Sequence, residues 1–191
     1  MTDLPASFFL QDVLIVAPRL LGCRLVVGGE ELTIIESEAY RGEADTACHA
    51  HHGRTKRTEM LYRRGGHVYV YLCYGIHSLL NIITGEADDP QGVLIRCCAG
   101  AEGPGKLTKR LGIDLSFNGL DILTTDRIGL FQGPTCAFET APRVGIGYAS
   151  QEDQKRLWRF IRKGEYAVRF ARPWHNRPLC AAVRLVGHQP F

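Results

Sequence analysis

The chain has 191 residues, of which 45% are hydrophobic, and carries a net charge of +3 at pH 7. This length suits one domain with a single core, and so weak a charge excludes nucleic-acid binding through overall charge, so any such binding needs a local basic patch. No apolar run reaches membrane-spanning length, no signal-peptide pattern begins the chain, and seven cysteines without a C-x-x-C pair indicate reduced thiols rather than disulfides or a zinc finger.

The N-terminal third predicts a helix followed by a hairpin. Apolar residues recur at nearly helical spacing over residues 8–21, with Pro18 inside the run, so we expect a helix that breaks or restarts near Pro18. Residues 24–27 and 32–37 have strand character and flank Gly28 and Gly29, which supply the positive φ of a tight turn. The second of these strands leads directly into Glu38.

The middle of the chain predicts a sheet. Residues 41–58 form a long polar run rich in His and Gly, which is typical of a binding loop. Runs of strand character then cover residues 68–74, 79–84 and 93–98. Together with the hairpin they predict one curved, mostly antiparallel sheet.

The last third adds helices to this sheet. Residues 106–111 read as a short helix whose N-terminal amides, helped by Lys106, could hold a phosphate. We expect a helix over residues 151–162, with Leu157, Trp158 and Ile161 facing inward, and a final strand over residues 166–170. Because no repeat or linker interrupts the chain, we expect one mixed α/β (α+β) domain spanning residues 1–191.

Glu38 is the first candidate for chemistry. A carboxylate at the end of a strand can be fixed in space and partly dried, which raises its basicity and lets it activate a water. An isolated Glu at a strand edge more often faces solvent. The neighbouring residues therefore decide between these two readings.

Tyrosines gather in the strand that follows. Strand alternation places Tyr69 and Tyr71 on one face, and Tyr74 immediately precedes Gly75, where a turn could push its ring outward. Such a stripe is either ordinary core or a stacking platform, and a platform requires basic residues around it. The nearby basic residues are Arg54, Lys56, Arg57, Arg63 and Arg64.

Residues 38–49 and 67–81 resemble the alkyladenine (3-methyladenine) DNA glycosylase family, the single-domain type found in mammals and many bacteria. The resemblance continues through residues 92–96, 103–107 and 142–147 and covers roughly residues 7–172. It implies a monofunctional glycosylase that flips damaged purines out of double-stranded DNA and hydrolyses the N-glycosidic bond without a cofactor or metal. It also implies a monomer with a protruding hairpin, intracellular and, in a bacterium, cytoplasmic and associated with the nucleoid.

The resemblance assigns roles residue by residue. Glu38 matches the general base, and Arg96 matches an arginine that orients the water or a phosphate. Tyr40, His49 and Tyr71 match the residues that line the base pocket, and Asn81 the one that crowds the amino group of guanine. Tyr74 matches the residue that enters the space left by the flipped base. The candidate contacts to the DNA backbone are Arg54, Lys106 and Arg143.

Two other classes of function stay open. A metal-dependent hydrolase could draw its ligands from Glu38, Cys48, His49, His51 and His52, and a chelator would then abolish its activity. A nucleic-acid-binding module, similar to the C-terminal domain of formyltransferases that act on initiator tRNA, would tolerate replacement of Glu38 by Gln.

Overall fold

The structure, a computed structural model, describes residues 2–164. Its strands are β1 (Arg24–Val27), β2 (Glu30–Arg41), β3 (Val68–Cys73), β4 (His77–Thr84), β5 (Gln91–Cys98), β6 (Ile128–Phe131), β7 (Phe138–Ala141) and β8 (Arg159–Arg162). Its helices are α1 (Ala6–Phe9), α2 (Val13–Arg19), α3 (Pro104–Leu111) and α4 (Gln151–Lys155), with 3-10 turns η1 (His49–His52), η2 (Glu59–Tyr62) and η3 (Leu115–Phe117).

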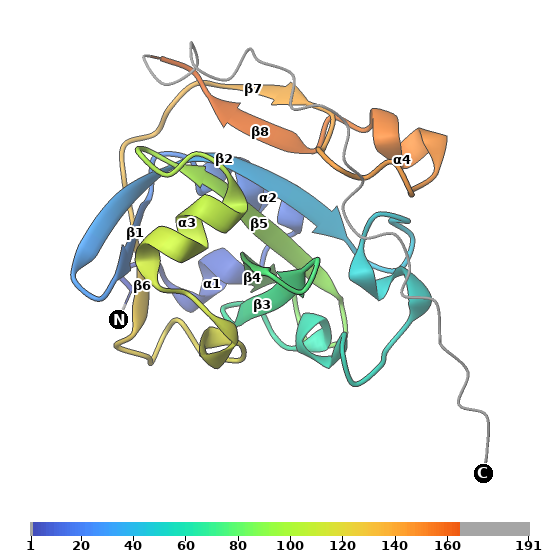
Figure 1. Ribbon diagram of the computed structural model, residues 1–191, viewed down its shortest axis with the longest axis horizontal. Coiled ribbons are helices and arrows are strands. Elements are labelled where there is room, and N and C mark those ends of the chain that lie inside the picture. The colour runs from blue at the N-terminus through green and yellow to red at the C-terminus, as the bar shows by residue number, and fades with distance from the viewer. Residues whose placement is uncertain (1, 165–191) are drawn as a thin grey trace.

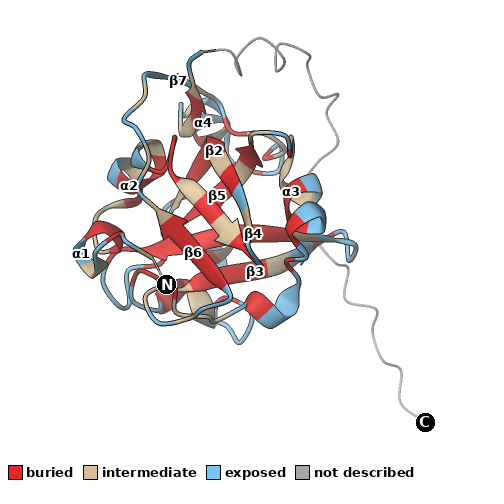
Figure 2. Ribbon diagram, turned by 90° about the vertical axis from the view of Figure 1, so that its left-hand side faces the viewer, coloured by how far each residue is buried: buried red, intermediate tan, exposed pale blue. Residues whose placement is uncertain are grey.

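The eight strands form one curled sheet (Figure 1). Their order is β3-β4-β5-β2-β1-β6, while β8 pairs with both β2 and β7, and every pairing is antiparallel. In both views α1 and α2 lie on one side of the sheet and α3 on the other (Figures 1 and 2). The expected class, a mixed α/β fold around a curved antiparallel sheet, is confirmed.

The main core fills the space between the sheet and these helices. Figure 2 shows buried residues running along the strands, whereas the exposed ones lie in turns and on outer helix faces. Fully buried side chains from α2, β4 and α3, such as Val16, Ile82 and Leu107, belong to one apolar cluster. Burial of such side chains is the main favourable contribution to folding. The helical run expected over residues 8–21 is interrupted, but at residues 10–12 and not at Pro18, which lies in the last turn of α2.

Strand β2 is the longest element and reaches three neighbours. It pairs with β1 at its start, with β5 from Ile34 to Arg41, and with β8 between Glu36 and Glu38. The expected strand ended at Ser37, whereas in the structure Glu38 lies inside β2 with a partner on either side. The carboxylate is therefore held by a sheet interior, which positions it more rigidly than a loop would.

The pairing of β2 with β5 contains two irregularities. Ile34 faces Cys98 but Glu36 faces Cys97, so β2 carries one extra residue; Ser37 then faces Ile95, so β5 carries one extra residue. The extra residue on β5 is Arg96. Such bulges bend a strand and re-aim its side chains.

The bulges change which residues share a face. Without them, Ile34 and Glu36 would point the same way, and so would Arg96 and Cys98. Instead Ile34 and Cys98 belong to the main apolar core, while Glu36 and Cys97 contact each other outside it. The sheet thus changes from an apolar surface to a charged one within two residues.

The β3–β4 hairpin ends in a tight turn. The amide of Ile76 donates to the carbonyl of Cys73, and Tyr74 and Gly75 between them have φ values of 53° and 71°. Glycine adopts positive φ freely, whereas a tyrosine there is strained. The turn leaves Tyr74 and Ile76 53% and 72% exposed.

The expected helix over residues 151–162 is wrong. Helix α4 ends at Lys155, and residues 159–162 form β8, because they hydrogen-bond to β2 and β7 instead of to one another. Leu157, expected to face inward, is 53% exposed. The strand expected over residues 166–170 lies outside the described residues. No helix of the described part is long and apolar enough to span a membrane.

Candidate active site

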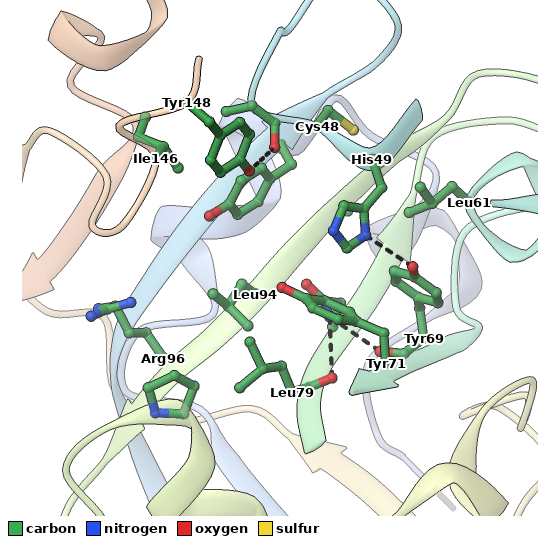
Figure 3. A pocket seen from close by; sticks show the side chains of 15 residues that line it. Cys48, His49, Leu61, Tyr69, Tyr71, Leu79, Leu94, Arg96, Ile146 and Tyr148 are labelled. Atoms are coloured by element: carbon green, nitrogen blue, oxygen red, sulfur yellow. Dashed lines mark hydrogen bonds between the residues drawn. The ribbon is translucent and has the colours of Figure 1, made fainter. Parts of the chain in front are cut away.

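A pocket opens between the tyrosine-bearing face of the sheet and the loop of residues 142–150 (Figure 3). Strands β3, β4 and β5 contribute one group of the residues that line it, and η1 and the loop contribute another. The residues lining it are Tyr40, Ala47, Cys48, His49, Leu61, Tyr69, Tyr71, Leu79, Asn81, Gly92, Leu94, Arg96, Pro104, Ile146 and Tyr148. Of the residues expected to form a base pocket, Tyr40, His49, Tyr71 and Asn81 all lie here.

Three rings stand together on one wall. The centroid of His49 lies 4.5 Å from that of Tyr71 with the planes 72° apart, and Tyr71 lies 5.5 Å from Tyr69 (Figure 3). Strand alternation brings the two tyrosines to one face as expected, while Val68 and Val70 enter the core on the other. Because the ring of His49 is nearly perpendicular to that of Tyr71, a flat ligand can stack on one of these rings and meet the edge of the other.

His49 is held in a neutral state. Its Nδ1 lies 3.0 Å from the hydroxyl of Tyr69, and burial, followed by the positive charge of Arg57, lowers its pKa to about 4. Desolvation disfavours the imidazolium, so the ring carries no charge at neutral pH. At His49 the pocket therefore presents an uncharged donor or acceptor.

Glu38 is fully buried next to this pocket. Its Oε1 accepts a 2.9 Å hydrogen bond from the amide of Val144 and lies 3.5 Å from Nη1 of Arg96, while its Oε2 accepts a 2.9 Å bond from the hydroxyl of Tyr40. Tyr40 and Arg96 line the pocket, but Glu38 itself does not. These contacts stabilise a carboxylate in a dry environment.

The hydroxyl of Tyr40 stays protonated. Burial, and then the negative charge of Glu38, raise the pKa of this phenol well above its usual value. A neutral hydroxyl can donate to a carboxylate, whereas a phenolate would repel it. Tyr40 is thus both a ring in the pocket wall and a hydrogen-bond donor to Glu38.

A second carboxylate lies beside Glu38. Glu36 is 3.1 Å from Nε of Arg96, accepts from Nη1 of Arg159 at 3.0 Å, and accepts from the thiol of Cys97 at 3.1 Å. Burial, and then the charge of Glu36, raise the pKa of the Cys97 thiol, so it remains a donor. Two arginines and two glutamates therefore form one buried, charge-balanced cluster.

The expectation that Arg143 contacts the DNA backbone is incompatible with this geometry. Its side chain is 0% exposed and forms two hydrogen bonds to Asp45, at 2.6 and 2.8 Å, and one to the carbonyl of Ala39 at 2.9 Å. The guanidinium also lies between the rings of Tyr40 and Trp158, 4.8 and 5.0 Å from their centroids. Arg143 is a structural residue that ties the loop to β2.

This loop completes the site. The residue after Arg143 donates its amide to Glu38, and further along the loop the hydroxyl of Tyr148 donates to the carbonyl of Ala47 at 3.0 Å (Figure 3). Asp153 accepts hydrogen bonds from the side chains of Thr46 and Ser150. Hydrogen bonds thus join the loop of residues 142–150 and α4 to the segment that carries His49.

Asn81 is oriented by the backbone. Its Nδ2 donates to the carbonyls of Tyr69 and Leu79 at 3.2 and 3.3 Å, and the residue is buried. Because carbonyl oxygens require a donor, these two contacts assign the amide nitrogen and leave Oδ1 as its accepting end. An acceptor fixed in the pocket can discriminate between ligands by the hydrogen bonds they offer.

The two other basic candidates lie at the surface. Lys106 is exposed in the first turn of α3. Arg54 is 46% exposed, forms ion pairs with Glu59 and Asp88, and lies 4.4 Å from the ring centroid of Tyr62. Exposed, salt-screened pairs of this kind exchange easily for a phosphate.

The histidines proposed as metal ligands point to separate partners. His49 contacts Tyr69, whereas Nδ1 of His51 lies 2.8 Å from the carbonyl of Glu43. Within residues 2–164 no three side chains of His, Cys, Asp or Glu form a group that could hold a metal ion. The six cysteines in this range are free thiols.

Several residues of the site were not expected from the sequence. These are Glu36, Arg159, the amide of Val144, and the pocket residue Tyr148. Glu36 had a signal in the sequence, because it precedes Glu38 by two positions in a strand, the spacing that places two side chains on one face. The other three come from segments that reach the site only through folding.

Comparison with known proteins identifies the family. A family model described as "Methylpurine-DNA glycosylase (MPG)" matches residues 7–101 and 99–166. A protein of Borreliella afzelii is 42% identical over 179 residues, covering 84% of this chain and 96% of the relative. One of Nitrosococcus oceani is 43% identical over 180 residues, with 83% and 90% covered, and one of Methanocella arvoryzae 37% over 195 residues, with 88% and 96% covered. All three are named "Putative 3-methyladenine DNA glycosylase". The chain therefore belongs to the methylpurine-DNA glycosylase family and is a DNA glycosylase.

Proposed function

We propose that this protein removes 3-methyladenine and other alkylated purines from double-stranded DNA by hydrolysis, with Glu38 as the general base. The observation that carries this proposal is the buried carboxylate of Glu38 between Arg96 and Tyr40, beside an aromatic pocket. The names of its relatives agree with such a substrate. Hypoxanthine and ethenoadenine are further candidate lesions, and the enzyme acts as a monomer.

The pocket chemistry supports a preference for alkylated purines. The ring of Tyr40 on one side and the ring of either Tyr71 or His49 on the other can stack against the faces of a flipped base; the planes of Tyr71 and His49 are 72° apart, so only one of them can lie flat on it. A cationic alkylpurine gains cation–π attraction that a normal purine lacks, and the neutral His49 does not repel it. Asn81 disfavours guanine by exclusion, because its buried amide crowds the amino group that guanine carries at C2.

The reaction is a displacement at C1′ of the sugar. Glu38 takes a proton from a water, a bond forms between the water oxygen and C1′, and the bond from C1′ to the purine nitrogen breaks with its electron pair passing to the purine. Positive charge builds on the sugar, and the carboxylate stabilises it. A cationic purine leaves as a neutral base and needs no protonation.

Glu38 keeps capacity to bind the attacking water. Its Oε1 accepts from the amide of Val144 and its Oε2 from the hydroxyl of Tyr40. Each carboxylate oxygen can accept a second hydrogen bond, so the water can bind Glu38 with both of these bonds in place. Arg96, whose Nη1 has no hydrogen-bond partner within the described residues, can then orient the water.

The exposed hairpin tip supports binding to duplex DNA. Flipping a base costs a few kcal/mol of lost stacking, which an apolar ring inserted into the gap partly restores. Tyr74 is held at the turn and is 53% exposed, beside the still more exposed Ile76. Lys106 and Arg54 are candidates for contacts to the backbone phosphates.

The test is abasic-site formation on duplex oligonucleotides that contain an alkylated purine or hypoxanthine, measured in EDTA. We expect base release by the wild type, its near-abolition in Glu38→Gln, and duplex binding by both. Glu31→Gln is the matched control, because Glu31 is exposed on the same strand.

Each other outcome has a distinct meaning. Equal activity of Glu38→Gln and the wild type would remove Glu38 from the role of general base. Loss of wild-type activity in EDTA would favour a metal-dependent hydrolase. Binding of the lesion duplex without base release by any variant would favour a binding module.

A further inference from the structure

Two hydrogen bonds and one further ion pair converge on Glu36, a buried carboxylate without a role in the proposed reaction. Its side chain is 4% exposed and contacts Arg96, Arg159 and the thiol of Cys97 at 3.0 to 3.1 Å. A buried charge is costly unless its partners compensate for desolvation. The partners of Glu36 therefore compensate for the cost of burying its charge.

The backbone is built to bring these groups together. Arg96 is the extra residue of the bulge on β5, and the shift places both Arg96 and Cys97 on the side of β2 that carries Glu36 and Glu38. Arg159 arrives from the other edge, because β8 pairs with β2 over residues 36–38. The irregular pairing thus assembles a charged cluster that regular strands would divide between two faces.

Within this cluster Arg96 is shared unequally between the two glutamates. Its Nε lies 3.1 Å from Glu36, whereas its Nη1 lies 3.5 Å from Glu38. Charge-assisted hydrogen bonds normally measure about 2.7 to 2.9 Å, so the contact to Glu38 is loose. A loose contact to Glu38 leaves Nη1 of Arg96 able to bind a water that lies beside the carboxylate.

The charges around Glu38 come from every element packed against it. Glu36 and Tyr40 lie on β2, Arg96 and Cys97 on β5, and Arg159 on β8. In the loop, the guanidinium of Arg143 is bound by Asp45. Tyr40 and Cys97 are neutral. The electrostatic potential at Glu38 therefore depends on the positive charges of Arg96 and Arg159 and on the negative charge of Glu36, which partly offsets them.

We propose that Glu36 is a positioning residue for the general base. It holds Arg96 by Nε and Arg159 by Nη1, so that Nη1 of Arg96 stays directed toward the water while neither arginine pairs tightly with Glu38. This inference rests on the proposed function of Glu38. Without the charge of Glu36, both arginines turn toward Glu38, which then binds them in place of the water.

The test measures single-turnover base release from a lesion duplex between pH 5 and 9. In Glu36→Gln we expect the rate constant to fall about tenfold to hundredfold, the loss usual when a group that orients another is removed. The acid limb of its rate profile shifts to lower pH, since unshared arginines favour the carboxylate form. Duplex affinity stays within about twofold, because Glu36 does not line the pocket.

Three variants separate this proposal from its alternatives. Glu31→Gln is the matched control: it removes the same charge from an exposed position of β2 that pairs with Arg24. Arg159→Gln removes a positive charge near Glu38 where Glu36→Gln removes a negative one, so the acid limb of its rate profile shifts to higher pH. The side chain of Arg159 is 24% exposed, so its loss is tolerated more easily than that of a core group. Glu38→Gln reports on the proposed function itself.

The outcomes are distinguishable. If Glu38→Gln is as active as the wild type, the proposed function fails. If Glu38→Gln is inactive but Glu36→Gln matches Glu31→Gln in rate and profile, Glu36 has no positioning role. A rate loss in Glu36→Gln with an unchanged pH profile and lower stability would assign it a purely structural role and overturn the proposal. If Glu36→Gln does not fold, Arg159→Gln decides, and an unshifted acid limb in that variant overturns it too.

Discussion

Replacing Asp45 by Ala tests the ion pair that anchors the loop over the pocket. Both carboxylate oxygens of Asp45 accept from the guanidinium of Arg143, at 2.6 and 2.8 Å, and both side chains are 0% exposed. The same oxygens accept from the amides of Arg41 and Ala47 at 3.0 Å. Asp45→Ala leaves a buried cation with one remaining acceptor, the carbonyl of Ala39.

The expected cost follows from this geometry. Breaking a buried ion pair by removing one partner typically costs about 3 to 5 kcal/mol, because the other charge stays buried without compensation. For a protein of about this size each kcal/mol lowers the melting temperature by about 2 to 4 °C, so we expect a decrease of roughly 6 to 20 °C. That is a large part of the roughly 5 to 15 kcal/mol by which proteins are stable.

Urea denaturation followed by tryptophan fluorescence measures this cost. Trp158 lies against the guanidinium of Arg143, with 5.0 Å between them, and so reports on the loop directly. The control is Glu30→Ala, which breaks the ion pair between Glu30 and Arg110. The side chains of these two residues are 40% and 43% exposed. An exposed pair contributes about 0 to 1 kcal/mol. If Asp45→Ala costs no more than this control at an unchanged m-value, the reasoning about the buried pair is refuted.

Three further predictions concern the pocket, the hairpin and the thiols. The native pKa of His49, about 4, lies below the ordinary value of 6.5, so between these pH values the unfolded state binds more protons than the native state. The free energy of unfolding should therefore fall as the pH falls from about 6.5 to 4. Urea titrations should show a smaller fall in His49→Phe. Tyr74→Ala should weaken binding to a lesion duplex about tenfold or more, since one stacked ring contributes about 1 to 3 kcal/mol; fluorescence anisotropy measures this. The melting temperature of the variant should change little, because Tyr74 is exposed. Burial raises the pKa of Cys48 and of Cys98 to about 12, so both should resist alkylation by iodoacetamide in the native protein and react after unfolding, as mass spectrometry can check.

Local patterns predicted much of the sheet. Two adjacent glycines indicated the β1–β2 hairpin because few other residues adopt positive φ without strain, and Gly28 and Gly29 have φ values of 58° and 85°. The alternation of Tyr69 and Tyr71 with valines placed the tyrosines on one face, where they line the pocket. Both signals depend on neighbouring residues only, and folding leaves them unchanged.

Where the decisive contact is distant, the same patterns failed. Residues 159–162 continue an acceptable helical pattern, but β2 and β7 offer hydrogen bonds that convert them to a strand. Arg143 has the chemistry of a phosphate ligand, and only its burial against Asp45, 98 residues earlier, makes it a structural residue. Propensity is a weak preference that tertiary contacts override.

The sequence by itself therefore determined which residue types are available to the site: Glu38, the tyrosines and His49 within one short segment of the chain. Tertiary structure decided how they act. The bulge at Arg96 changes which side chains of β5 face β2, and the loop of residues 142–150 brings an amide to Glu38. The physical reason has two parts. The face of a sheet on which a side chain lies depends on the register with the partner strand, and the charge state of a side chain depends on its burial. Register and burial exist only in the folded chain.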